Sequence, residues 1–306
     1  MKINATQYCL IILTLLAKSS WGFHAHKTIH SQAIFTLPIE MSPFFLDHAH
    51  DLKERAVTAD KRRYTDTTEA CKHYIDLDLY GIYPFENIPR KWFNAKELYT
   101  KDTLKSRGIL PWVINWEYKN LVWAMDSGSK EEVLKHAADI GHYISDANVP
   151  LHTTSNYNGQ HSNQKGIHAL WESRIPENYS ETYDYFVGKA QYIEDPLEFA
   201  WNTVLESNLL LNKTLEQEKI ATERTRKDGK YKMDVSNGKV HSEYTTEFIA
   251  EYNFALSNMV ERRLQSSIKA VGSLWYSAWI DAGQPNLNLL KSKKEQPLLI
   301  ALIVVR

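Results

Sequence analysis

Apolar residues recur at three- and four-residue intervals along most of the chain, which is the spacing of one face of an α-helix. Residues 130–147 show the pattern most clearly, and Pro150 ends it. A second run, residues 26–37, has a narrower apolar face and is closed by Pro38. The spacing therefore predicts a helix over each of these two stretches.

A longer helical pattern covers residues 243–282, and we expect it to break near Gly272. No stretch alternates apolar and polar residues convincingly, as a half-buried strand would. Residues 155–166 and 224–239 are rich in Asn, Gly, Ser and Lys, so we expect loops there, the second a mobile insertion. No clear linker divides the chain. The sequence predicts an all-α fold, a single-domain multi-helix bundle over residues 21–290.

The first twenty residues differ from the rest and predict an export signal. Lys2 supplies a positive start, and residues 9–17 form an apolar stretch too short to span a membrane as a stable helix. Small residues follow at Ser19 and Ser20. We expect residues 1–20 to be a signal peptide and the mature protein to be secreted or periplasmic. A buried N-terminal helix is the alternative.

The opposite end carries a tail, residues 291–306, to which we assign no role. Its apolar run, residues 298–305, is too short to cross a bilayer as a helix, and either an edge strand or a sticky terminus fits it. Once the signal is removed, Cys71 has no cysteine partner within the chain. Packing must then stabilise the fold, and a contribution from metal stays open.

Charge narrows the choice of partners. The chain has 36 Lys and Arg residues against 37 Asp and Glu residues, so it has no overall basic field to attract nucleic acid or acidic membranes. This lowers the weight of a nucleic-acid substrate, which nevertheless stays open. We expect a monomer, and no stable protein partner is implied.

The strongest chemical signal lies between His142 and Glu172. His142 and Asp146 are four residues apart on a predicted helix, and so are His168 and Glu172. This spacing puts two side chains on one helix face, with Cβ atoms roughly 5–6 Å apart. His152 follows where the first helix ends. One such pair is commonly a solvated helix face, but two joined pairs favour a metal site, and zinc prefers such nitrogen and oxygen ligands.

Further candidates lie upstream. Asp60 precedes a basic cluster at residues 61–63, and His73 follows thirteen residues after Asp60. Taken alone, Asp60 fits a charge at a helix end and His73 fits a core histidine. The stretch Trp21 to His26 begins where a signal peptidase would cut.

Together these residues resemble the zinc-dependent phospholipase C family and its relatives, the single-strand-specific zinc nucleases of plants and fungi. The resemblance runs from Trp21 to Glu172, about half of the chain. It implies an all-helical fold that binds three zinc ions in a cleft. It assigns one ion to Asp60, His73, His142 and Asp146; a second to Asp146, His26 and the amine and carbonyl of Trp21; and a third to His152, His168 and Glu172.

The resemblance also implies catalytic roles. Arg63 would bind the phosphate, and Asp60 or Asp146 would accept a proton from the attacking water. An α-amine titrates near about 8, so Trp21 would lose its proton to a metal at little cost. That ligand exists only after cleavage, which predicts an enzyme that is inactive until it is exported.

Two substrate classes fit these residues. The short spacing from Trp21 to His26 and the position of Arg63 resemble the nucleases, whereas Glu172 and the lack of disulfides resemble the phospholipases. We expect a zinc-dependent hydrolase of phosphodiester bonds and favour a phospholipase C that releases diacylglycerol and a phosphorylated head group. The alternatives are a single-strand-specific endonuclease or 3'-nucleotidase and, third, a non-catalytic zinc-stabilised helical module.

Overall fold

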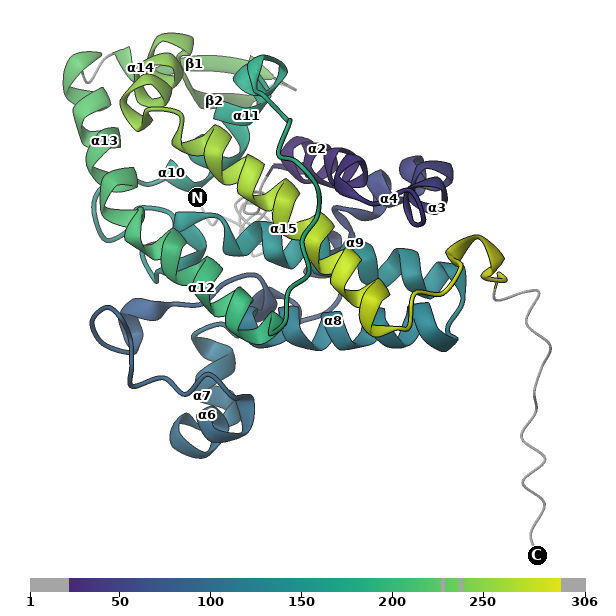
Figure 1. The fold of residues 1–306 in the computed structure, drawn as a ribbon. Coiled ribbons are helices and arrows are strands. Elements are labelled where there is room, and N and C mark those ends of the chain that lie inside the picture. Colours follow the sequence, from purple (N-terminus) through teal and green to yellow (C-terminus); the bar gives the residue numbers. More distant parts are fainter. Residues whose placement is uncertain (1–21, 227–228, 237–238, 293–306) are drawn as a thin grey trace, which may run out of the picture.

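Helices dominate the computed structural model, which describes residues 22–226, 229–236 and 239–292 (Figure 1). The proposed signal peptide, Trp21 and the apolar run at residues 298–305 lie outside the described residues. Within the described ranges, none of the helices combines the length and the apolar content that crossing a bilayer requires.

The elements follow one another with short connections. The first half holds α2 (Phe23–Ala33), η1 (Ile34–Thr36), α3 (Ser42–Asp47), α4 (Ala49–Arg55), α5 (Thr58–Arg62), η2 (Ala70–Lys72), η3 (Leu77–Leu79), α6 (Trp92–Tyr99), α7 (Lys101–Ser106), α8 (Leu110–Ser127) and α9 (Lys130–Ala147). The second half holds η4 (Pro150–Thr153), α10 (Ile167–Ala169), the π-helix η5 (Leu170–Arg174), α11 (Ile175–Tyr179), η6 (Ser180–Thr182), α12 (Pro196–Leu209), α13 (Leu211–Arg224), β1 (Tyr231–Ser236), β2 (Lys239–Tyr244), α14 (Thr246–Leu256), α15 (Met259–Asp281) and η8 (Leu287–Leu289).

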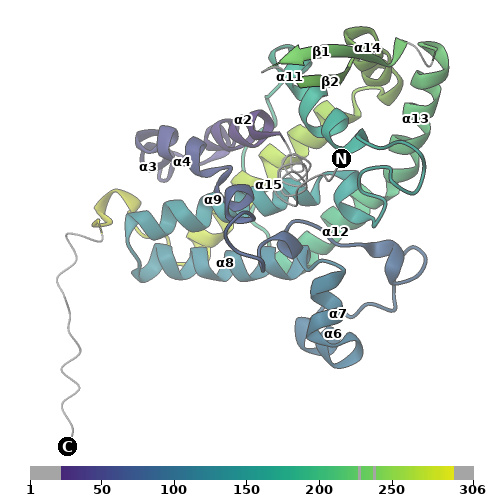
Figure 2. The same ribbon diagram turned by 180° about the vertical axis from the view of Figure 1, so that it is seen from behind.

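The centre of the bundle is the helix pair α8 and α9, which lie side by side (Figures 1 and 2). The long helix α15 packs against both, and α2 packs against α15, α9 and α4. Four tryptophans are fully buried: Trp112 in α8, Trp171 in η5, Trp201 in α12 and Trp275 in α15. The indole of Trp275 stacks on Phe45 and donates a hydrogen bond to the carbonyl of Ala137 in α9.

The helix predicted over residues 130–147 is confirmed as α9 with the same bounds. Its start is fixed by a capping box, because Ser129 accepts a hydrogen bond from the amide of Glu132 while the Glu132 carboxylate accepts one from the amide of Ser129. Nearly every residue of its second half is buried, including polar ones. A buried polar stretch in a central helix is where a functional site can be built.

The prediction for residues 243–282 is wrong about where the helix breaks. The break lies at Ser257 and Asn258, whose positive φ angles of 52° and 61° separate α14 from α15. Gly272 lies inside α15 and does not break it. A side chain at this position would place its Cβ 1.9 Å from Thr36 Oγ1, so only glycine fits. The glycine therefore serves the close approach of α15 to the end of α2 and η1, not a kink.

The loop expected over residues 224–239 is also only partly correct. An antiparallel hairpin of β1 and β2 pairs Tyr231 with Tyr244, so the described chain includes two short strands that the pattern did not predict. Tyr244 stacks on Phe248 of α14 at 5.5 Å, which anchors the hairpin to the helices. Polar residues make up much of both strands, which conceals the alternation expected of a half-buried strand.

Replacing Gly272 with alanine should destabilise the protein although alanine is the better helix former. Alanine gains up to about 1 kcal/mol in helix propensity, but its Cβ would overlap Thr36 Oγ1 at 1.9 Å. We expect a net loss of about 1–3 kcal/mol in the free energy of unfolding, measured by urea denaturation.

A double variant provides the control for this prediction. Adding Thr36→Ala to Gly272→Ala removes the overlapping oxygen and should recover part of the loss, although it also removes the hydrogen bond from Thr36 to the carbonyl of Ala33. A single variant as stable as the wild type would contradict the close contact between α15 and Thr36.

Candidate metal centre

Eight of the nine expected metal ligands lie within the described residues, and they come together from separate helices. Each is at most 6 % exposed. Their positions are His26 in α2, Asp60 in α5, His73 just after η2, His142 and Asp146 in α9, His152 in η4, His168 in α10 and Glu172 in η5. Buried imidazoles and carboxylates at this density are costly unless they are paired with one another or coordinate metal ions.

The first group consists of Asp60, His73, His142 and Asp146. Nδ1 of His73 lies 2.9 Å from Asp146 Oδ2 and 3.1 Å from His142 Nε2. Asp60 Oδ1 lies 3.7 Å from the first of these nitrogens and 3.8 Å from the second. Ligand atoms on a zinc tetrahedron stand roughly 3.3–3.6 Å apart when the metal bonds are about 2.0–2.2 Å. The observed separations bracket that value, so these side chains can hold one metal ion.

The carboxylate of Asp146 faces two sides. Its Oδ2 points to the first group, whereas its Oδ1 lies 3.4 Å from Nε2 of His26. The second group is therefore His26 with Asp146, and His142 lies close enough to both to belong to this group as well as to the first. The rings of His26 and His142 stack, with their centres 3.9 Å apart. One carboxylate whose oxygens meet two different sets of nitrogens has the arrangement of a bridging ligand.

The third group consists of His152, His168 and Glu172. Oε2 of Glu172 lies 2.9 Å from Nε2 of His168 and 3.3 Å from Nε2 of His152. Glu172 belongs to the π-helix η5, a widened turn that is frequent at functional sites. The backbone of Gly22 donates a hydrogen bond of 3.0 Å to the carbonyl of Glu172. The described chain thus begins against the segment that carries this group.

Backbone carbonyls orient two of the histidines. Nδ1 of His142 lies 2.8 Å from the carbonyl of Ala56, and Nδ1 of His152 lies 2.5 Å from the carbonyl of His73. A carbonyl oxygen only accepts, so we assign the proton to Nδ1 in each ring. The lone pair of each Nε2 then faces the carboxylates, as metal binding requires.

Three buried carboxylate oxygens of these groups accept no hydrogen bond from the described residues. Among the described residues, neither oxygen of Asp60 accepts a hydrogen bond, and Oε1 of Glu172 accepts none. Both carboxylates are buried. Buried polar groups are normally hydrogen-bonded, and the exceptions commonly mark an ion or water. The donor set therefore fits a metal centre made of nitrogen and oxygen ligands.

The protonated forms of the histidines compete with metal. Burial opposes the charge on His142 and His152, but the neighbouring carboxylates of Asp146, Asp60 and Glu172 outweigh it and raise the pKa of both histidines to about 9. Burial opposes the charge of Asp146 as well, yet His142 and His152 hold the pKa of this carboxyl well below its usual value. Without metal, the site is thus neutralised by protons on imidazoles, and metal ions would replace those protons.

The arginines beside Asp60 occupy different environments. Arg63, whose side chain is 29 % exposed, places NH1 3.7 Å from Asp60 Oδ1. Arg62, the middle residue of the basic cluster, donates hydrogen bonds to Glu69 and to the hydroxyl of Tyr143. Sequence reasoning missed Glu69 and Tyr143. The spacing of four residues between Glu69 and His73 was the available signal for Glu69.

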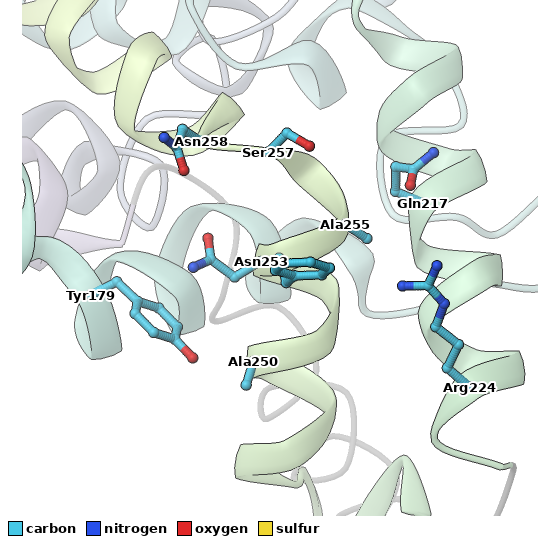
Figure 3. A pocket seen from close by; sticks show the side chains of 9 residues that line it. Tyr179, Gln217, Arg224, Ala250, Asn253, Ala255, Ser257 and Asn258 are labelled. Atoms are coloured by element: carbon cyan, nitrogen blue, oxygen red, sulfur yellow. The ribbon is translucent and has the colours of Figure 1, made fainter.

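Two cavities lie away from these three groups. One, of about 650 Å³, is lined by residues of α11, α13 and α14, including Tyr179, Gln217 and Asn253 (Figure 3). The other, of about 870 Å³, is lined by α12, α15 and the segment that contains Phe186 and Tyr192. None of the residues of the three groups lines either cavity.

Comparison with known proteins adds no assignment: no family model matches the chain, and a search of curated proteins finds no match.

Zinc binding to the metal-free protein should release protons near neutral pH. His142 and His152 have pKa values raised to about 9, so at pH 7 both are imidazolium ions. Metal must displace the second proton of each ring. Zinc affinity should rise with pH up to about 9, by about tenfold per unit for each displaced proton. Titration calorimetry in buffers of different ionisation enthalpy counts these protons. A release of fewer than about one proton at pH 7 would contradict the raised pKa values.

Proposed function

We propose that the protein is a zinc-dependent phosphodiesterase of the phospholipase C and zinc nuclease type, with three zinc ions held by the three groups. The observation that carries the proposal is the carboxylate of Asp146, whose two oxygens face separate sets of histidine nitrogens. A structural zinc site is normally a closed set of four protein ligands, whereas catalytic sites leave positions open. The third group has three ligands among the described residues, His152, His168 and Glu172, which leaves a position open and favours catalysis over a stabilising role.

Zinc is the metal that the ligand chemistry favours. The first group offers two imidazoles and two carboxylates, and every oxygen ligand among the described residues of the three groups is a carboxylate. Calcium and magnesium prefer sets made of oxygen alone, whereas zinc takes mixed nitrogen and oxygen ligands at tetrahedral spacing. Bound zinc lowers the pKa of water and stabilises charge that develops on phosphate oxygens.

The second group would be completed by the amine and carbonyl of Trp21. Trp21 lies outside the described residues, but two observations on its neighbours support the idea. Gly22 is held by a hydrogen bond to the carbonyl of Glu172, and His26 follows one turn later in α2. A Cβ on Gly22 would lie 2.6 Å from Ser173 Oγ, so the chain passes close to η5 at this point.

Arg63 would bind the phosphate of the substrate, and Asp60 would accept a proton from the attacking water. The guanidinium of Arg63 is partly exposed beside the first group, where its planar fork can bind two phosphate oxygens. Asp60 is a buried carboxylate whose oxygens accept no hydrogen bond from the described residues, so it has the capacity to take a proton from an attacking water. Asp146, with each oxygen facing imidazole nitrogens, is the less free of the two candidate bases.

We favour a phospholipid as the substrate. The near-zero charge of the chain provides no general attraction for a polyanion such as nucleic acid. Phe23, 49 % exposed on α2 three residues before His26, has Lys61 at 6.0 Å from its ring centre. The exposed ring of Phe23 would contact a lipid chain, and the ammonium group of Lys61 beside it would contact the phosphate.

A single-stranded nucleic acid is the second candidate, favoured by one observation. Tyr157, 46 % exposed, lies with its ring centre 5.8 Å from that of His168 in the third group. An accessible aromatic ring beside a metal centre can stack a nucleobase, which is how many proteins hold single strands.

Replacing Asp146 with asparagine should abolish turnover and remove one or two zinc ions per molecule. The amide keeps the shape but loses the charge that offsets two cationic sites, so we expect activity to fall by more than about 100-fold. Zinc is counted by atomic emission on the protein used for the assay. Asp126→Asn, the same change at an exposed position on α8, should leave both quantities unchanged. Near-normal turnover in Asp146→Asn would refute the bridging role.

The substrate class is decided by a side-by-side assay of the purified mature protein on phosphatidylcholine vesicles and on single-stranded DNA. Phospholipase activity should release phosphocholine, and it should exceed the release of nucleotides by at least about tenfold in kcat/KM. The reverse order would establish the nuclease alternative. Three bound zinc ions with no turnover of either substrate would instead support a non-catalytic zinc-stabilised module.

A further inference from the structure

A buried cluster of polar and charged side chains lies behind the first group. At its centre is Glu69, whose side chain is fully buried. Oε1 of Glu69 accepts a hydrogen bond of 3.1 Å from Arg62 and one from the hydroxyl of Tyr143, while Oε2 accepts one of 2.6 Å from Lys72. Arg62 in turn donates to Asp139 at 2.9 Å. These donors hold the Glu69 carboxylate ionised and in one orientation.

The imidazole of His73 stands between this cluster and the first group. Its Nδ1 meets Asp146 Oδ2 at 2.9 Å and His142 Nε2 at 3.1 Å. Its Nε2, buried and without a hydrogen bond to the described residues, lies 3.6 Å from Oε1 of Glu69. The ring packs edge-on against Tyr143 at 5.4 Å, which restricts its rotation.

The chemistry of a neutral imidazole connects these two contacts. The ring carries one N–H, so a metal at Nδ1 requires the proton at Nε2, where it needs an acceptor. Oε1 of Glu69 lies a few tenths of an ångström beyond hydrogen-bond length from that nitrogen, a gap that a small tilt of the ring closes. By contrast, His142 and His152 turn their outer nitrogens to backbone carbonyls, which carry no net charge.

We propose that Glu69 is a positioning residue for the metal centre, which accepts the Nε2–H of His73 and thereby selects Nδ1 as the metal-binding atom. Its role rests on the proposed function only in so far as the first group binds zinc. A carboxylate behind a histidine ligand fixes its tautomer and raises its basicity, and removing such a partner typically weakens metal binding about 10–100-fold. Arg62, Lys72 and Tyr143 hold this carboxylate in place.

The test is zinc affinity, measured by competition with a chromogenic chelator on the purified mature protein. Glu69→Gln keeps the shape and an acceptor oxygen but loses the charge. We expect it to give up one of its zinc ions at a chelator concentration about 10–100-fold lower than the wild type does, with the others held as before. Glu69→Asp, which retains the charge on a shorter side chain, should lie between the two.

Glu117→Gln is the matched control. Glu117 contacts Nδ1 of His136 at 2.7 Å, the same pair of residue types outside the three groups. It should leave zinc affinity unchanged. A purely structural role for Glu69 would instead lower the unfolding midpoint of the zinc-free protein in Glu69→Gln and leave the affinity for every ion intact, and that result would overturn the proposal.

A second measurement needs no variant and covers the case in which Glu69→Gln fails to fold. Proton–nitrogen correlation spectra of the zinc-loaded wild type should show His73 with its proton on Nε2. A proton on Nδ1 would overturn the proposal. Because neither measurement uses turnover, a protein with no phosphodiesterase activity that shows the predicted zinc affinities would refute the proposed function and leave this role of Glu69 standing.

Discussion

The concentration of ionisable groups in an interior without solvent is the constraint from which the rest follows. Asp146 is fully buried, and around it stand four histidine rings within 4.0 Å of its oxygens: His26, His73, His142 and His152. Such groups can be kept in a protein core only if cations or protons balance the carboxylates. The elements that carry these groups range from the 18-residue helix α9 to the three-residue helix α10, and their packing places the carboxylates and imidazoles side by side.

Helix caps, backbone carbonyls and neighbouring side chains each help to orient these buried groups. The capping box at Ser129 and Glu132 fixes where α9 starts. The start of the helix in turn fixes the face on which His142 and Asp146 lie, 13 and 17 residues after Ser129. Carbonyls of neighbouring turns then orient individual rings, and a buried glutamate with its cationic partners lies behind one of them. The geometry of the three groups is thus set partly by backbone and side chains that do not belong to them.

The sequence predicted the parts of this arrangement that depend on local spacing. His142 with Asp146, and His168 with Glu172, lie one turn apart, and one face of a helix or π-helix brings each pair together. Asp60 and His26 came from their place in an ordered set of motifs, and the structure brings them to the same interior. The assignment of Trp21 lies outside the described residues.

What local spacing did not predict depends on contacts between distant segments. Gly272 suggested a break, but its purpose is contact with Thr36, more than two hundred residues away in the chain. Arg62 belongs to a run of basic residues that suggests a surface, yet Asp139 and Tyr143 of α9 draw it inward. The hairpin of β1 and β2 was missed because its packing against α14 is supplied by Tyr244 and Phe248, not by a continuous apolar face.

The backbone of His73 has a consequence beyond its side chain. Its imidazole belongs to the first group, while its carbonyl accepts the hydrogen bond that orients His152 in the third group. The ordering of one residue is therefore shared by two groups that could each hold a metal ion, and the conformational entropy lost when the first is occupied does not have to be lost again at the other. An ion at the first group should accordingly make binding at the third more favourable, without requiring that both groups fill together.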